Sequence, residues 1–86
     1  MTYSEMKAKE VLESLEERDK TSQNALVLKH LFTVGAITPI EALNNYGCVR
    51  LGARIWNLRQ LGVPIETQTV IKDGKHYASY RLEGSA

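Results

Sequence analysis

The chain has 86 residues, 43% of them hydrophobic, which is enough for one modest core and leaves no room for a second domain. Its single cysteine, Cys48, excludes an internal disulfide, and no stretch is long and apolar enough to span a bilayer. The N-terminus carries charges throughout, unlike a signal peptide, so we expect a protein of the reducing cytoplasm.

The formal net charge of +1 conceals an uneven distribution. Residues 1–20 hold four basic and six acidic side chains, whereas residues 21–86 hold seven basic and four acidic ones. This asymmetry predicts two parts with different partners: an N-terminal amphipathic helix within 1–20 and a separate domain over 21–86. An ordinary solvated surface can show the same distribution, so charge alone does not establish that the two parts have different partners.

The first predicted element is a helix over residues 4–18. Its apolar side chains form one narrow stripe at helical spacing, and the other faces are charged. A stripe this narrow suits packing on one neighbour. That neighbour is either the rest of the domain or the same helix of a second subunit, which would make a homodimer through residues 4–18. The stripe consists of Ala8, Val11, Leu12 and Leu15.

A second helix is predicted over residues 25–34, with Thr21 or Ser22 as its N-cap and Gly35 as its end. The next two residues, 36–37, are too few for a helix and could form a very short strand.

Two more helices follow. Residues 38–41 read Thr-Pro-Ile-Glu, which supplies an N-cap, a proline at the first helical position and the glutamate of a capping box. We therefore predict a short helix over 39–44, followed by a turn. The next helix is predicted over 49–61, because Leu51, Ile55 and Leu58 have the spacing of a core face.

Residues 65–71 and 76–82 are rich in β-branched and aromatic side chains and are predicted to be strands. Asp73-Gly74 between them is a strong signal for a two-residue hairpin. The register that this turn sets predicts four opposed pairs: Ile65 with Leu82, Thr67 with Tyr80, Glu66 with Arg81, and Lys72 with Lys75.

This order of elements predicts an α+β fold. A short capped helix, a turn and a longer helix form a helix-turn-helix, and the hairpin makes it the winged variety. The expected architecture is a three-helix core with a C-terminal β-hairpin wing and an extra N-terminal helix. The second helix of such a pair normally enters the major groove of double-stranded DNA, which is the predicted partner.

On a helical wheel, the helix 49–61 turns a basic and polar face away from its core face. The arginine fork suits guanine edges or phosphates, whereas asparagine and glutamine suit adenine edges. The two lysines that flank the hairpin turn could hold a phosphate between them. The predicted DNA-binding residues are Arg50, Ala53, Arg54, Asn57, Arg59 and Gln60 on the helix, with Lys72 and Lys75 on the wing.

Several of these residues also have an ordinary structural interpretation. Exposed arginines are usually just solvated, and Arg59 could pair with a carboxylate or cover a hydrophobic edge. Trp56 could face DNA or be buried against the N-terminal helix. Lysines beside a turn commonly aid solubility, although directly opposed like charges cost stability.

No catalytic machinery is predicted. The two histidines, His30 and His76, lie on different elements, and Cys48 has no evident base beside it. We therefore expect no enzymatic activity, no catalytic residues, no metal and no cofactor. Gly52 is unusual in the first turn of a helix, and a close approach to DNA or to the preceding helix would explain it.

Three runs carry a resemblance to a known family: AITPIEALNNYG (36–47), RLGARIWNLR (50–59) and YRL (80–82). They resemble a family of small helix-turn-helix proteins of tailed bacteriophages and prophages. The resemblance implies a winged helix that binds DNA inside a bacterial host cell, as a transcriptional regulator or as an accessory factor in replication or recombination. It also implies that Arg50, Arg54 and Arg59 occupy the family's basic positions.

The alternative function is a protein–protein interaction module, in which the winged helix binds a host or phage protein, because fold alone does not fix function. The acidic N-terminal helix favours this alternative, and the basic helix and wing favour DNA. The N-terminal helix lies outside the resembling motif, so its role is not implied by it.

Overall fold

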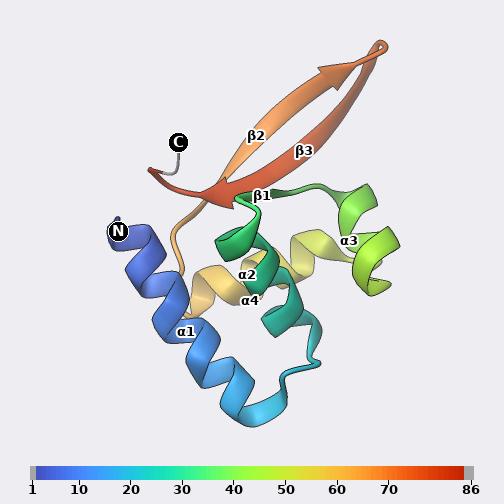
Figure 1. Cartoon of the computed structure of the whole chain (residues 1–86). Coiled ribbons are helices and arrows are strands. Elements are labelled where there is room, and N and C mark those ends of the chain that lie inside the picture. Colours follow the sequence, from blue (N-terminus) through green and yellow to red (C-terminus); the bar gives the residue numbers. More distant parts are fainter. Residues whose placement is uncertain (1, 85–86) are drawn as a thin grey trace.

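The structure is a computed structural model that describes residues 2–84. Its elements follow the predicted order, and the fold is the predicted α+β winged helix-turn-helix with a preceding helix (Figure 1). The elements are α1 (Tyr3–Asp19), α2 (Gln23–Thr33), β1 (Ala36–Ile37), α3 (Pro39–Tyr46), α4 (Leu51–Gln60), β2 (Ile65–Lys72) and β3 (Lys75–Leu82).

Side-chain caps start the first three helices. Thr2 accepts a hydrogen bond from the Glu5 backbone N–H at the start of α1, and Ser22 caps α2 in the same way. Thr38 and Glu41 form the predicted capping box of α3. Each cap satisfies a backbone donor that a helix start leaves free and is worth about 1 kcal/mol.

Helix boundaries differ from the prediction by one or two residues at several ends, and α2, for example, starts at Gln23 rather than at residue 25. α3 continues to Tyr46, and Gly47 ends it with a left-handed φ of 63°. α4 starts at Leu51 rather than at residue 49, and Arg50 is its N-cap without any side-chain cap hydrogen bond. Val49 therefore lies outside the helix and is 83% exposed. The start of α4 has no local capping signal, so periodicity alone placed it too early.

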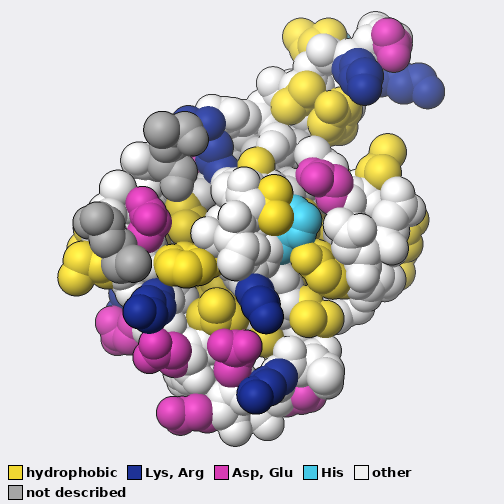
Figure 2. Space-filling model, in the orientation of Figure 1, with side chains coloured by type: hydrophobic (Ala, Val, Ile, Leu, Met, Phe, Trp, Pro, Cys, Tyr) yellow, Lys and Arg dark blue, Asp and Glu magenta, His cyan; other side chains and the backbone are white. Residues whose placement is uncertain are grey.

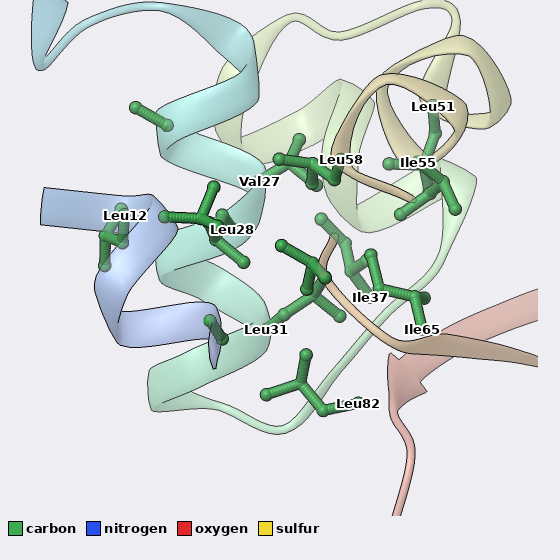
Figure 3. Packing of buried hydrophobic residues seen from close by; sticks show 14 of the residues in the cluster. Leu12, Val27, Leu28, Leu31, Ile37, Leu51, Ile55, Leu58, Ile65 and Leu82 are labelled. Atoms are coloured by element: carbon green, nitrogen blue, oxygen red, sulfur yellow. The ribbon is translucent and has the colours of Figure 1, made fainter. Parts of the chain in front are cut away.

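The apolar stripe of α1 packs against α2 of its own domain. Ala8, Val11 and Leu12 are buried there, and Figure 3 shows Leu12 pointing toward Leu28 of α2. The sequence left two possible neighbours for this stripe. The structure shows that it packs on the rest of its own domain.

One core joins the helices to the base of the sheet. Buried aliphatic side chains from α2, α4, β1 and both hairpin strands meet at its centre (Figure 3). Burying each large one stabilises the fold by about 1.5–3 kcal/mol. The labelled members from these elements are Val27, Leu28, Leu31, Ile37, Leu51, Ile55, Leu58, Ile65 and Leu82.

The sheet has the antiparallel strand order β1-β3-β2. Asp73 and Gly74 both have positive φ, at 52° and 76°, as the type I′ hairpin turn requires. The predicted register is confirmed, because each of the four predicted pairs is observed. Since β1 pairs only at its two residues, most of the hairpin projects from the body as a wing (Figure 1).

Across residues 2–84, no helix has both the length and the apolar character that crossing a membrane requires.

Candidate nucleic-acid interface

α4 separates a buried face from an exposed face. Leu51, Ile55 and Leu58 are buried in the core, as predicted. Ala53 and Gln60 are exposed on the other side, as is Gly52. No residue of α4 carries a carboxylate, so nothing on this helix repels a phosphate backbone.

The arginine at the start of α4 is free to move toward a ligand. Arg50 is exposed, and its side chain makes no cap hydrogen bond. The positive end of a helix and its first backbone N–H groups favour an anion such as a phosphate. This position is therefore compatible with the predicted phosphate or base contact of Arg50.

Arg54 and Asn57 are half-buried rather than fully solvated. The Nε atom of Arg54 is buried, and no acceptor among residues 2–84 bonds to it. A buried donor without a partner costs free energy, and an acceptor on a docked ligand can relieve this cost only if the guanidinium moves outward. Arg54 is thus the member of the predicted set with an unmet hydrogen-bonding requirement.

Arg59 is engaged with the hairpin. Its Nε and Nη2 donate to the Ile65 carbonyl oxygen at 3.1 and 2.9 Å, and Nη2 also donates to Thr67 Oγ1 at 2.9 Å. The sequence suggested a carboxylate partner or a hydrophobic edge as the ordinary role of Arg59, but the structure shows a backbone carbonyl and a hydroxyl. The contact of Arg59 with DNA stays a prediction. To form it, the guanidinium would have to give up some of its hydrogen bonds to Ile65 and Thr67.

Trp56 projects from α4 into solvent, with 60% of its surface exposed. It does not belong to the buried core and is not buried against α1. The structure thus excludes burial against α1, one of the two orientations that the sequence left open, and contact of Trp56 with DNA stays a prediction. An aromatic side chain on this face adds a flat apolar surface to the predicted DNA contact.

The wing carries the other predicted contacts. Lys72 and Lys75 oppose each other directly beside the turn, and both are exposed. Figure 2 shows basic side chains gathered at the far end of the wing, with an acidic one beside them. Asp73 in the turn accounts for that negative charge. At the base of the wing, Glu66 pairs with Arg81 at 2.6 Å, as the register predicted.

His30 has a structural role that sequence reasoning did not identify. It is buried, its Nδ1 lies 2.7 Å from the Tyr46 hydroxyl, and its Nε2 lies 4.0 Å from Glu41 Oε2. These contacts join α2 to both ends of α3. They depend on how the helices pack, so local spacing gives no signal for them.

Within residues 2–84, no cluster of three or more His, Cys, Asp or Glu could hold a metal ion. Cys48 is buried.

Gly52 is not required by packing against the preceding helix. A Cβ at this position would meet only the Tyr80 hydroxyl within 4 Å, at an ordinary distance of 3.9 Å. The other explanation for Gly52, close approach to DNA, stays a prediction.

Comparison with known proteins agrees with this geometry. A family described as winged helix-turn-helix domain matches residues 22–84, which leaves α1 outside the matched region. No curated protein and no solved structure matches the chain. The winged helix-turn-helix is typically a DNA-binding fold. Since the match spans α2 to the end of the wing, the chain belongs to the winged helix-turn-helix domain family.

Proposed function

We propose that this protein binds double-stranded DNA with α4 in the major groove and the wing on the flanking phosphates. The observation that carries the proposal is the exposed face of α4, which has arginines and amides and no carboxylate, beside a wing that ends in paired lysines. An α-helix fits the width of the major groove, and base edges there can be distinguished.

The residues divide into two groups by chemistry. Arg54, Asn57 and Gln60 are the candidates for base edges, because their side chains form paired hydrogen bonds with guanine or adenine. Arg50, Lys72 and Lys75 are the candidates for phosphates. Phosphate contacts supply most of the affinity, and base contacts supply the sequence preference.

The biological role that we propose is that of a phage- or prophage-type transcriptional regulator, or of an accessory factor in replication or recombination, in the cytoplasm of a bacterial host. The support for this role is the resemblance of residues 36–47, 50–59 and 80–82 to small phage helix-turn-helix proteins.

A homodimer through residues 4–18 stays a prediction, with a two-fold symmetric DNA site as its consequence. Because α2 already covers the apolar stripe of α1, two copies would have to meet through other exposed side chains, such as Tyr3 and Met6. Sedimentation at tens of micromolar protein tests it: a dimer mass supports the prediction, and a monomer mass rules it out.

The DNA proposal is tested by the salt dependence of binding. We would measure fluorescence anisotropy with a labelled duplex of about 25 base pairs, more than two helical turns. The wild type is compared with Lys72→Gln/Lys75→Gln and with Lys9→Gln/Lys20→Gln, a control that removes two exposed lysines outside the wing and α4.

We expect affinity to fall steeply as salt rises. The wing variant should reduce the slope of log affinity against log salt by about 2, about one for each lost phosphate contact, whereas the control should leave it unchanged. Equal slopes in all three proteins would show that the wing does not hold phosphates.

A further inference from the structure

The outer edge of β3 is open along the wing. β1 pairs with β3 only through Ala36–Arg81 and Ile37–Tyr80. Within residues 2–84, the part of β3 from residue 75 to 79 therefore has a neighbouring strand on its β2 side alone. Such an edge presents unpaired backbone donors and acceptors to any strand that approaches it.

The hairpin register identifies which backbone groups are open. In a hairpin with a two-residue turn, the pair that flanks the turn, here Lys72 and Lys75, exchanges hydrogen bonds, and bonded pairs alternate along an antiparallel ladder. The backbone groups of Tyr77 and Ser79 therefore point to β2. Those of His76 and Ala78 point to the free edge.

A groove lies beside this edge. It separates the start of α3, at Pro39 and Ile40, from Tyr77 on the wing, and its volume is about 410 Å³. Ile40 is 70% exposed. Figure 2 shows hydrophobic side chains on both sides of the hollow between the wing and the body. The groove could hold one large apolar side chain of a strand on the β3 edge.

The charge around the groove favours an acidic occupant. Lys72 and Lys75 line it, and no carboxylate does. Two acidic residues are neighbours in sequence of its lining: Asp73 in the turn, and Glu41, whose carboxylate already accepts hydrogen bonds from the Thr38 backbone and hydroxyl. The wing of a second copy would bring the same lysines, so charge favours a different partner.

We propose that an extended, acidic segment of a partner protein adds to the open edge of β3 as a further strand. Its backbone bonds to His76 and Ala78, one apolar side chain enters the groove against Ile40 and Tyr77, and its carboxylates meet Lys72 and Lys75. Main-chain bonds supply affinity and the pocket supplies specificity in this mode of recognition. The inference does not rest on DNA binding, but it implies that peptide and duplex compete for the lysines.

The probe is a synthetic peptide of about nine residues, a common strand length. Valine and threonine alternate in it around a central phenylalanine, with two aspartates at each end. A second peptide has lysines in place of the aspartates, and a third has prolines within the strand. Binding to the full chain is followed by the backbone amide shifts of ¹⁵N-labelled protein.

We expect the acidic peptide to shift the amides of His76 and Ala78 in a saturable way, and the other two peptides to bind at least about tenfold more weakly. Ala78→Pro removes the N–H that points to the free edge and leaves the β2 ladder intact, since proline is tolerated on edge strands. It should weaken the peptide by about tenfold.

Ile40→Ser keeps the test decisive if the proline variant does not fold. Its matched control is Ile71→Ser, because Ile71 is similarly exposed, at 66%, but lies on the opposite face of the hairpin from Tyr77 and does not line the groove. We expect weaker peptide binding for Ile40→Ser and unchanged binding for Ile71→Ser.

Three results would overturn the proposal. One is no amide shift at His76 and Ala78 with the acidic peptide at millimolar concentration. Another is equal binding of the lysine peptide. The third is a concentration-dependent shift of these amides in protein alone, which would assign the edge to a second copy. Duplex binding without these peptide shifts would leave the proposed function standing while this proposal fails, and peptide shifts in a protein that binds no duplex would do the reverse.

Discussion

Arg59 connects the end of α4 to the base of the wing. Three hydrogen bonds run from its guanidinium to Ile65 and Thr67, across the turn between helix and strand. A guanidinium holds a fixed planar fork, so these bonds also fix the direction in which the hairpin leaves the helix. Trp56, one turn earlier in α4, takes no part in this connection and is exposed.

We predict that Arg59→Met lowers the free energy of unfolding by about 1–3 kcal/mol, because the variant keeps an apolar stem but leaves the Ile65 carbonyl without its partner. Urea denaturation measures this. The control is Arg50→Met, which removes an exposed arginine without a cap bond and should change stability by less than about 0.5 kcal/mol. Equal stability of the two variants would contradict the structural role of Arg59.

The carboxyl of Asp19, at the end of α1, makes the stability of the fold depend on pH. Hydrogen bonds from the Thr21 hydroxyl and backbone N–H lower the pKa of its carboxyl below the ordinary value. Because the folded pKa is lower than the unfolded one, this group stabilises the fold above its unfolded pKa, and the contribution is lost as pH falls through the folded value. NMR titration should show a lowered pKa that returns toward the ordinary value in Thr21→Val. An unchanged midpoint in that variant would contradict the assignment.

Among the elements, those with local chemical signals could be predicted from the sequence. The hairpin register follows from Asp73 and Gly74, which accept positive φ, and the start of α3 follows from its capping box. The start of α4 has no side-chain cap, so its boundary was placed two residues too early.

The features that the sequence could not supply depend on packing between distant segments. The contacts of His30 and Arg59 and the exposure of Trp56 are set by how α3, the hairpin and α1 lie against their neighbours. The opposed wing lysines were predictable, because a two-residue turn alone determines them.

For α4 as an element, we predict that Gly52→Ala stabilises the protein by up to about 1 kcal/mol, since alanine favours a helix and its Cβ would make an ordinary contact with Tyr80. Thermal unfolding measures the gain. If the backbone of α4 approaches DNA closely at Gly52, the same variant should bind a duplex more weakly. A more stable variant with unchanged duplex affinity would rule out that approach.

At the scale of the whole molecule, α1 is part of the same core as the winged domain, although it lies outside the family match. Its charged outer face and the basic α4 and wing give the molecule two surfaces of different character. Figure 1 places α1 and the projecting wing on different sides of the helical body.

We predict that Leu12→Ala lowers the stability of the whole chain by about 2–4 kcal/mol, because Leu12 is buried against α2. Unfolding should remain a single transition when followed by circular dichroism and by the fluorescence of Trp56 on α4. Two separated transitions would show that α1 is an independent unit. Leu43→Ala, which truncates a half-exposed leucine on α3, is the matched control.

The measurement that tests the central claim most directly is an amide and indole shift map of ¹⁵N-labelled protein during titration with a duplex at low salt. DNA binding through α4 and the wing predicts that the shifts concentrate at Ala53, Gln60, the Trp56 indole and the turn at residues 72–75, while α1 stays unchanged. Shifts concentrated on α1, or none at any duplex concentration, would contradict DNA recognition by this helix and wing.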